Sequence, residues 1–68
     1  MGVKYKVVAG EQFLGHFPAK TPLEAVKKAI QKNYAYHKDV IEDPNTVFTA
    51  QKGAMNPVHK FAANGQEV

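Results

Sequence analysis

The stretch Thr21–Ile30, TPLEAVKKAI, carries the strongest local structural signal in this 68-residue chain. Thr21 can accept a hydrogen bond at a helix N-terminus, Pro22 suits the first helical position, and Glu24 completes a capping box. The apolar side chains that follow recur at helical spacing: Leu23, Val26, Ile30 and Tyr34. The sequence therefore predicts a helix over about residues 22–34 that packs one face against a core.

Two segments upstream of this helix have the pattern of strands. Residues 3–8 alternate, with Val3, Tyr5 and Val7 on one face and Lys4 and Lys6 on the other. A second strand is predicted over residues 12–17, and the turn at Gly10 joins the two as a hairpin. Gly15 between two phenylalanines indicates a bulge or a close approach of the backbone. Pro18 is expected to end the second strand.

A second hairpin is predicted downstream of the helix. Residues 43–45, Asp-Pro-Asn, have the composition of a turn, and strands are expected at 46–51 and 58–62 around the loop 52–57. Residues 64–68 have the composition of a frayed tail.

These elements give the order β-β-α-β-β in one domain spanning residues 1–68. The predicted class is α+β, a small curled antiparallel sheet or pseudo-barrel of about four to five strands with one covering helix.

Composition and charge exclude several classes of function. Lysines and arginines number nine against six acids, giving a net charge of +3, and all nine are lysines. Serine and cysteine are absent, which excludes the usual nucleophiles and a thiolate zinc site. The histidines His16, His37 and His59 lack ligand spacing, so we expect no metal, no cofactor and no enzyme activity. No apolar run reaches the roughly 18–20 residues of a membrane span, and an intracellular protein is expected.

Three segments resemble the archaeal methanogen chromosomal protein family. Gly15–Ala29 has its Gly-x-Phe, Lys-x-Pro and Ala-x-x-Lys-Ala pattern, and Val47–Gly53 and Val58–Ala62 are similar to its strand-Gly-turn and Val-His-x-Phe strand. The family consists of small monomeric proteins that bind and sharply bend double-stranded DNA. This chain differs from them in having no arginine and in carrying Leu23 where they have a basic residue. The resemblance implies a related scaffold and a monomeric, nucleoid-associated protein, or a divergent or virus-encoded relative in a viral nucleoprotein.

Five lysines are candidates for contact with DNA phosphates: Lys4, Lys6, Lys20, Lys52 and Lys60. If the fold gathers them on one side, their ammonium groups would bind the phosphate backbone and release counterions. The alternative is an ordinary solvated surface, on which edge lysines also discourage strand-to-strand aggregation. The remaining helix lysines are interpreted as a solubilising face: Lys27, Lys28 and Lys32.

Met55, Asn56 and Pro57 form a candidate loop contact with DNA. Minor-groove proteins insert methionine or proline between base steps, and asparagine can bond to groove edges. The alternative, which the sequence favours, is a plain turn whose methionine folds back onto the core.

Two further clusters are interpreted as structural. Tyr34–His37 contains aromatic side chains that can stack on exposed bases, but packing of this helix end under the sheet is favoured. The acidic residues Asp39, Glu42 and Asp43 are predicted to form a solvated turn facing away from DNA rather than an acid–base pair.

The sequence thus favours a non-catalytic architectural protein that binds double-stranded DNA through lysines, with little sequence discrimination, and bends it. Lysine lacks the planar fork with which arginine reads guanine, so base specificity should be poor. Two alternatives stay open: an RNA-binding or ribosome-binding protein, and a protein-interaction module such as a small virion component.

Overall fold

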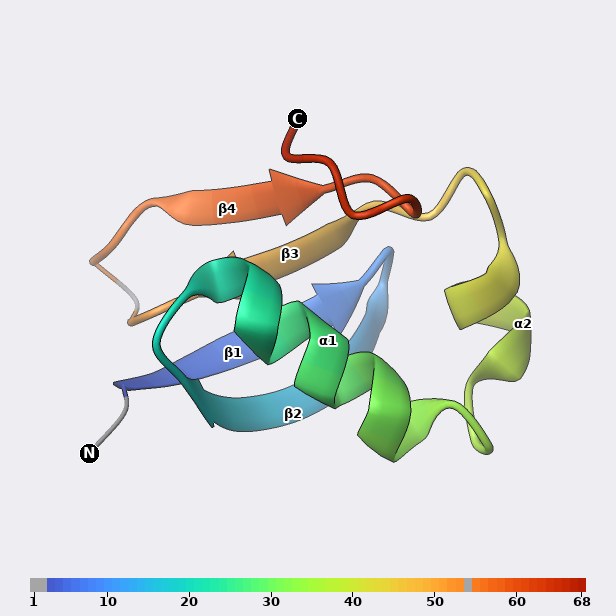
Figure 1. Ribbon diagram of the computed structural model, residues 1–68, viewed down its shortest axis with the longest axis horizontal. Coiled ribbons are helices and arrows are strands. Elements are labelled where there is room, and N and C mark those ends of the chain that lie inside the picture. The colour runs from blue at the N-terminus through green and yellow to red at the C-terminus, as the bar shows by residue number, and fades with distance from the viewer. Residues whose placement is uncertain (1–2, 54) are drawn as a thin grey trace.

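The computed structural model describes residues 3–53 and 55–68, which form one antiparallel sheet with a helix packed on one face (Figure 1). The elements in chain order are β1 Val3–Ala9, β2 Gln12–Ala19, α1 Pro22–Asn33, α2 Lys38–Glu42, β3 Phe48–Gln51 and β4 Val58–Phe61. The strands lie in the order β2-β1-β3-β4, and each neighbouring pair is antiparallel. The α+β class and the β-β-α-β-β order are confirmed, with the short helix α2 added after α1.

The alternation of the strands separates a buried face from an open one, because successive side chains of a strand point to opposite sides. The face under α1 is formed by buried side chains: Tyr5, Val7, Ala9, Phe48, Ala50 and Phe61. From α1, Val26 packs against them together with Ala25 and Ala29, whose small side chains let the helix lie close to the sheet. The hydrophobic core therefore lies between α1 and the sheet.

The first hairpin contains the predicted bulge. Gly10 makes the turn with φ 61°, and Gly15 has φ 126°. The register shifts between Val7 and Val8, so that Leu14 has no partner on β1. Sequence analysis expected Pro18 to end β2, which was wrong: β2 continues to Ala19. Proline is tolerated there because β2 is an edge strand, where a missing N–H need not break the ladder.

The helix α1 begins and ends through side-chain hydrogen bonds. The Thr21 hydroxyl accepts from the backbone N–H of Glu24 at 3.2 Å, as the capping box predicted. At the other end the Asn33 amide donates to the carbonyl oxygens of Ala29 at 2.9 Å and Leu14 at 3.0 Å. The last bond satisfies the carbonyl of the bulge residue and ties the helix end to β2.

The acidic segment after α1 is a helix rather than the predicted loop. α2 carries Asp39 and Glu42, and its Ile41 is buried in the core. The Thr46 hydroxyl donates to the carbonyl of Val40 at 2.7 Å, so this residue closes α2 and β3 starts only at Phe48. The prediction of a strand from residue 46 was therefore wrong at its start.

The C-terminal residues are paired, where the sequence predicted a frayed tail. Gly65 turns the chain with φ 89°, and Glu67 forms a bridge with Phe61. The backbone N–H of Val68 donates to the carbonyl of Lys60 at 2.9 Å. Since β3 occupies the other side of β4, residues 67 and 68 pair with the end of its free edge, at Lys60 and Phe61.

Candidate nucleic-acid interface

The face of the sheet opposite α1, here called the open face, is exposed and basic. The strand register assigns it Lys4, Lys6 and Val8 of β1, Phe13, His16 and Pro18 of β2, Thr49 and Gln51 of β3, and Val58 and Lys60 of β4. The alternation that buries one side of each strand therefore collects lysines on the other. The described strands contain no Asp or Glu on either face, and Glu11 borders the open face from the turn between β1 and β2.

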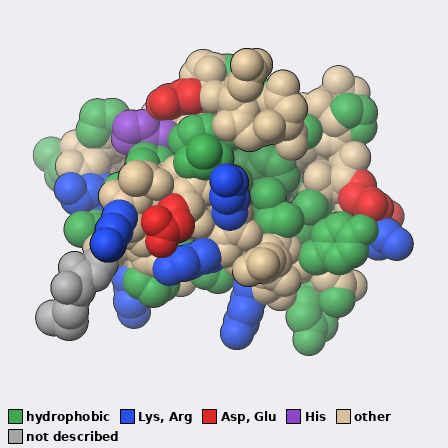
Figure 2. Space-filling model, viewed as in Figure 1, with side chains coloured by type: hydrophobic (Ala, Val, Ile, Leu, Met, Phe, Trp, Pro, Cys, Tyr) green, Lys and Arg blue, Asp and Glu red, His purple; other side chains and the backbone are tan. Residues whose placement is uncertain are grey.

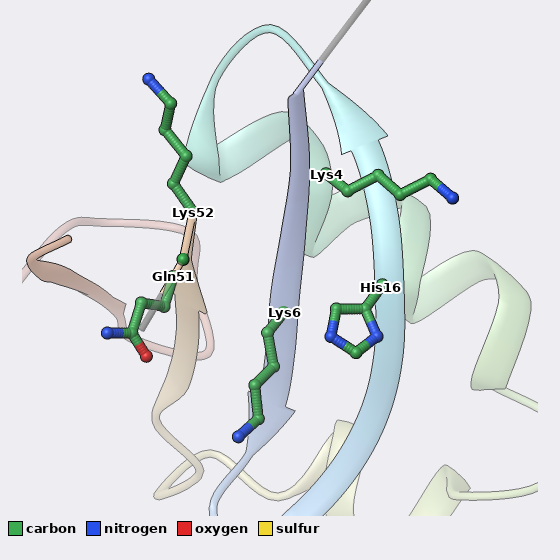
Figure 3. Close-up of a pocket in the computed structure, with 6 residues that line it drawn as sticks. Lys4, Lys6, His16, Gln51 and Lys52 are labelled. Carbon is green, nitrogen blue, oxygen red and sulfur yellow. The ribbon is translucent and has the colours of Figure 1, made fainter. Parts of the chain in front are cut away.

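Two strands and the end of a third bring basic side chains around one shallow hollow of about 270 Å³. We call it the lysine hollow; its lining residues are Lys4, Lys6, His16, Gln51, Lys52 and Gly53. Figure 3 shows these side chains on the near side of the sheet, with α1 behind it. The amines of Lys4, Lys6 and Lys52 point in different directions, so their charge is spread over a surface rather than focused on one point.

Of the carboxylates that the structure describes, Glu11 borders the open face from the turn between β1 and β2, and the others lie elsewhere. Glu24 pairs with Lys28 at 3.5 Å on α1, and Glu67 pairs with His59 at 3.2 Å beside β4. Lysines and acids are mixed on the α1 side of the molecule (Figure 2). Among the described residues, no ion pair involves a lysine of the open face or Lys52. Within the part of the chain that the structure describes, the lysines of this face are therefore not neutralised by direct ion pairs.

The five predicted phosphate-binding lysines are not all equivalent. Lys4, Lys6 and Lys52 line the lysine hollow, and Lys60 lies on the open face opposite Thr49. Lys20 is exposed directly after β2, near the start of β1, and is not part of the hollow's lining.

The loop between β3 and β4 exposes its methionine, which the sequence had favoured as folded back onto the core. Met55 is 97% exposed, so the prediction that it folds back onto the core was wrong. The Gln51 amide donates to the carbonyl of Asn56 at 2.8 Å, which ties the loop to the strand that borders the lysine hollow. Met55 and Pro57 are thus exposed beside the candidate interface; Ala54 of the predicted loop lies outside the described residues.

The sequence predicted that the aromatic cluster after α1 packs under the sheet, and this prediction was wrong. Tyr34 is 41% exposed and Tyr36 82% exposed. The Tyr34 hydroxyl donates to the Glu42 carboxylate at 2.7 Å, and this bond raises the pKa of Tyr34 above its ordinary value. The Lys38 amine lies 5.9 Å from the centre of the Tyr34 ring. These contacts join α1 to α2, so the cluster is separate from the open face.

Sequence reasoning missed Phe13 and His16 as members of the interface. The two rings meet edge to face, with centroids 5.5 Å apart and planes at 67°. Simple alternation back from Phe17 would put Phe13 on the covered side, but the extra residue Leu14 shifts the phase. The signal that could have revealed this was Gly15, which the sequence marked as a bulge without deciding its effect on Phe13.

No metal-binding group of three or more His, Cys, Asp or Glu side chains occurs within the part of the chain that the structure describes. Across the same residues, no helix has the length and apolar character needed to cross a membrane. Searches of family models, curated proteins and solved structures found no match to this chain.

Proposed function

We propose that this protein binds DNA through the open face of its sheet, holding the phosphate backbone by lysines with little base discrimination. The observation that carries this proposal is the collection of cations on one sheet face: Lys4, Lys6 and Lys60 share the open face, and none of them forms an ion pair among the described residues. The resemblance of Gly15–Ala29 to DNA-bending chromosomal proteins supports the same conclusion.

The chemistry of this surface suits an extended polyanion. Each lysine that neutralises a phosphate releases a counterion, which favours binding most strongly at low salt. The diverging amines of the lysine hollow fit a row of phosphates better than a single small anion. Crowding like charges on one face also opposes folding of the free protein, and a bound polyanion relieves that repulsion.

Bending of the duplex is the finer part of the proposal. It rests on Met55, which is 97% exposed in a loop held beside the lysine hollow by the bond from Gln51 to Asn56. An apolar side chain inserted between base steps kinks DNA toward the major groove. In this proposal Met55 is that side chain, and Pro57 limits the flexibility of its loop.

The test is a fluorescence-anisotropy titration of a short DNA duplex over a range of salt concentrations. Affinity should fall steeply with salt, and the double variant Lys4→Gln/Lys6→Gln should reduce the log–log slope by roughly 1.8, because each lost phosphate contact removes about 0.9. The matched control is Lys27→Gln/Lys32→Gln, which removes the same charge from the outer face of α1.

Two outcomes would contradict the proposal: absence of duplex binding at low salt, or an equal loss of slope in the control. Titrations with RNA and with single-stranded DNA distinguish the RNA-binding alternative. Docking through a sheet edge is disfavoured, because residues 67 and 68 pair with the end of β4 and Pro18 lies on the other edge strand.

A further inference from the structure

A second shallow hollow adjoins the lysine hollow on the open face. It measures about 520 Å³ and is lined by Lys6, Val8, Glu11, Phe13 and His16. We call it the phenylalanine hollow. Because Lys6 and His16 line both hollows, the two form one continuous surface that changes from basic to partly apolar.

The hollow owes its character to an aromatic ring that the fold leaves in water. Phe13 is 48% exposed, although phenylalanine is among the residues most often buried. The bulge at Leu14 directs it to the open face, opposite Val8, and the edge-to-face contact with His16 supports its ring. Across the sheet from this position, the structure buries Phe48 and Phe61 instead. The Phe13 side chain therefore contributes little to the hydrophobic core.

The two ends of the phenylalanine hollow carry opposite charges. Lys6 supplies a positive charge where the hollow meets the lysine hollow, and Glu11 supplies a carboxylate from the turn between β1 and β2. Between them lie the apolar surfaces of Phe13 and Val8. A complementary ligand carries an anion at one end, a flat apolar body in the middle and hydrogen-bond donors at the other. A nucleotide has these features: a phosphate, a base with a π face, and amino or imino groups on the base edge.

We propose that the phenylalanine hollow binds a nucleobase, which stacks on the ring of Phe13 while Lys6 neutralises the adjoining phosphate. Glu11 accepts a hydrogen bond from the base edge and repels phosphate from that end, so the nucleotide binds in one orientation. This inference rests on the proposed function, since the rest of the strand is held by the lysines. The base is supplied either by an unpaired strand or by a step of the duplex that Phe13 opens.

The absence of tryptophan from the chain provides a direct test. Phe13→Trp places one fluorescent indole in the hollow and keeps a stacking surface there. Addition of single-stranded DNA should quench its emission, because a base stacked on the indole quenches the excited state by electron transfer. The matched control is Tyr36→Trp, at an 82% exposed aromatic position in the turn between α1 and α2, and its emission should not change.

Affinity measurements then separate stacking from charge. Phe13→Ala should weaken binding by about 5- to 150-fold, the range expected for loss of one base–aromatic stack, with the salt slope unchanged. Phe13→Leu, which keeps an apolar side chain but no π face, should also weaken binding. Circular dichroism establishes that each variant is folded. The Phe13→Trp titration tests for the nucleobase even if both truncated variants fail to fold.

The outcomes distinguish this inference from the function on which it rests. Salt-dependent binding without quenching in Phe13→Trp, or with unchanged affinity in Phe13→Ala and Phe13→Leu, overturns the nucleobase site and leaves the lysine surface intact. Failure of the unsubstituted protein to bind duplex DNA at low salt overturns the proposed function itself. Quenching by single strands alone assigns the site to an unpaired base, and equal quenching by duplex assigns it to a base step.

Discussion

The two faces of the sheet are built by the same strands and differ in almost every physical property. On the covered face, Val7 and Ala50 are fully buried and Phe48 is 1% exposed. On the open face, Phe13 is 48% exposed and Val58 45% exposed, among lysines that have no acidic partner within the described residues. One residue step along each strand is enough to pass from the core to a charged surface.

This difference separates residues that specify the fold from residues that are free to serve binding. The covered face is constrained by packing, since a core tolerates neither a cavity nor an unpaired charge. The open face is under no such constraint, and unpartnered lysines beside a half-exposed phenylalanine do not help a small domain to fold. Their presence there is consistent with the proposed contact with nucleic acid.

The largest expected difference between the two faces is in the free energy of unfolding, measured by truncating one phenylalanine on each face. Phe48→Ala removes a fully buried ring and should cost about 3–5 kcal/mol, a large part of the stability of so small a domain. Phe13→Ala should cost only about 1 kcal/mol, because its ring is already half in water. Urea unfolding with linear extrapolation measures both free energies.

If Phe48→Ala is too unstable to give a folded baseline, Phe48→Leu provides the measurement with a smaller loss. Equal costs for the substitutions at Phe48 and Phe13 would show that the open face is also part of the core. The assignment of the phenylalanine hollow to a ligand would then lose its basis.

A smaller effect on stability is expected at Gly15, which belongs to the bulge that directs Phe13 to the open face. Gly15 has φ 126°, a conformation that other residues rarely adopt, and an added Cβ would lie 3.3 Å from the Phe17 ring. Gly15→Ala should therefore reduce the free energy of unfolding by about 1–3 kcal/mol. The control is Gly10→Asn: its φ of 61° suits asparagine, and nothing lies within 4 Å of the added Cβ. A Gly15→Ala variant as stable as this control would contradict the assigned bulge.

The smallest effect concerns the contact between α1 and α2, remote from either face. The Tyr34 hydroxyl must be protonated to donate to Glu42, and this bond raises its pKa above 10.0 in the folded state. Its contribution to stability is present below pH 10.0, the ordinary pKa, and is lost as the pH rises through the raised value.

Tyr34→Phe should accordingly lower the melting temperature slightly at pH 8, with the difference from the unsubstituted protein shrinking at strongly alkaline pH. Tyr36→Phe is the matched control, because no hydrogen bond of its hydroxyl occurs among the described residues. A difference for Tyr34→Phe that grows with pH would mean that the hydroxyl does not act as donor to Glu42.

Predictions from the sequence were most accurate where a local pattern acts alone. The capping box at Thr21 and the alternation of Val3–Val7 fixed the start of α1 and the two faces of β1. They were least accurate where a distant contact decided the outcome. α2 forms around the buried Ile41 and is closed by Thr46, and the C-terminal pairing depends on the free edge of β4.

The candidate site shows the same division. Alternation along β1 was sufficient to put Lys4 and Lys6 on one surface, whereas the inclusion of Lys52 and Lys60 required the register of β3 and β4. The exposure of Met55 and of Tyr36 also depended on which apolar residues the core had room to accept.

The amino-acid sequence by itself determined the secondary structure around the first hairpin and α1, the excess of lysine over acid, and the basic outer side of β1. Only the tertiary structure decided that this charge is gathered over the open face and that Phe13 joins the lysines. The physical reason is that periodicity and capping act between neighbours in the chain. Strand pairing and the phase shift at a bulge are instead fixed by the packing of residues far apart in the sequence.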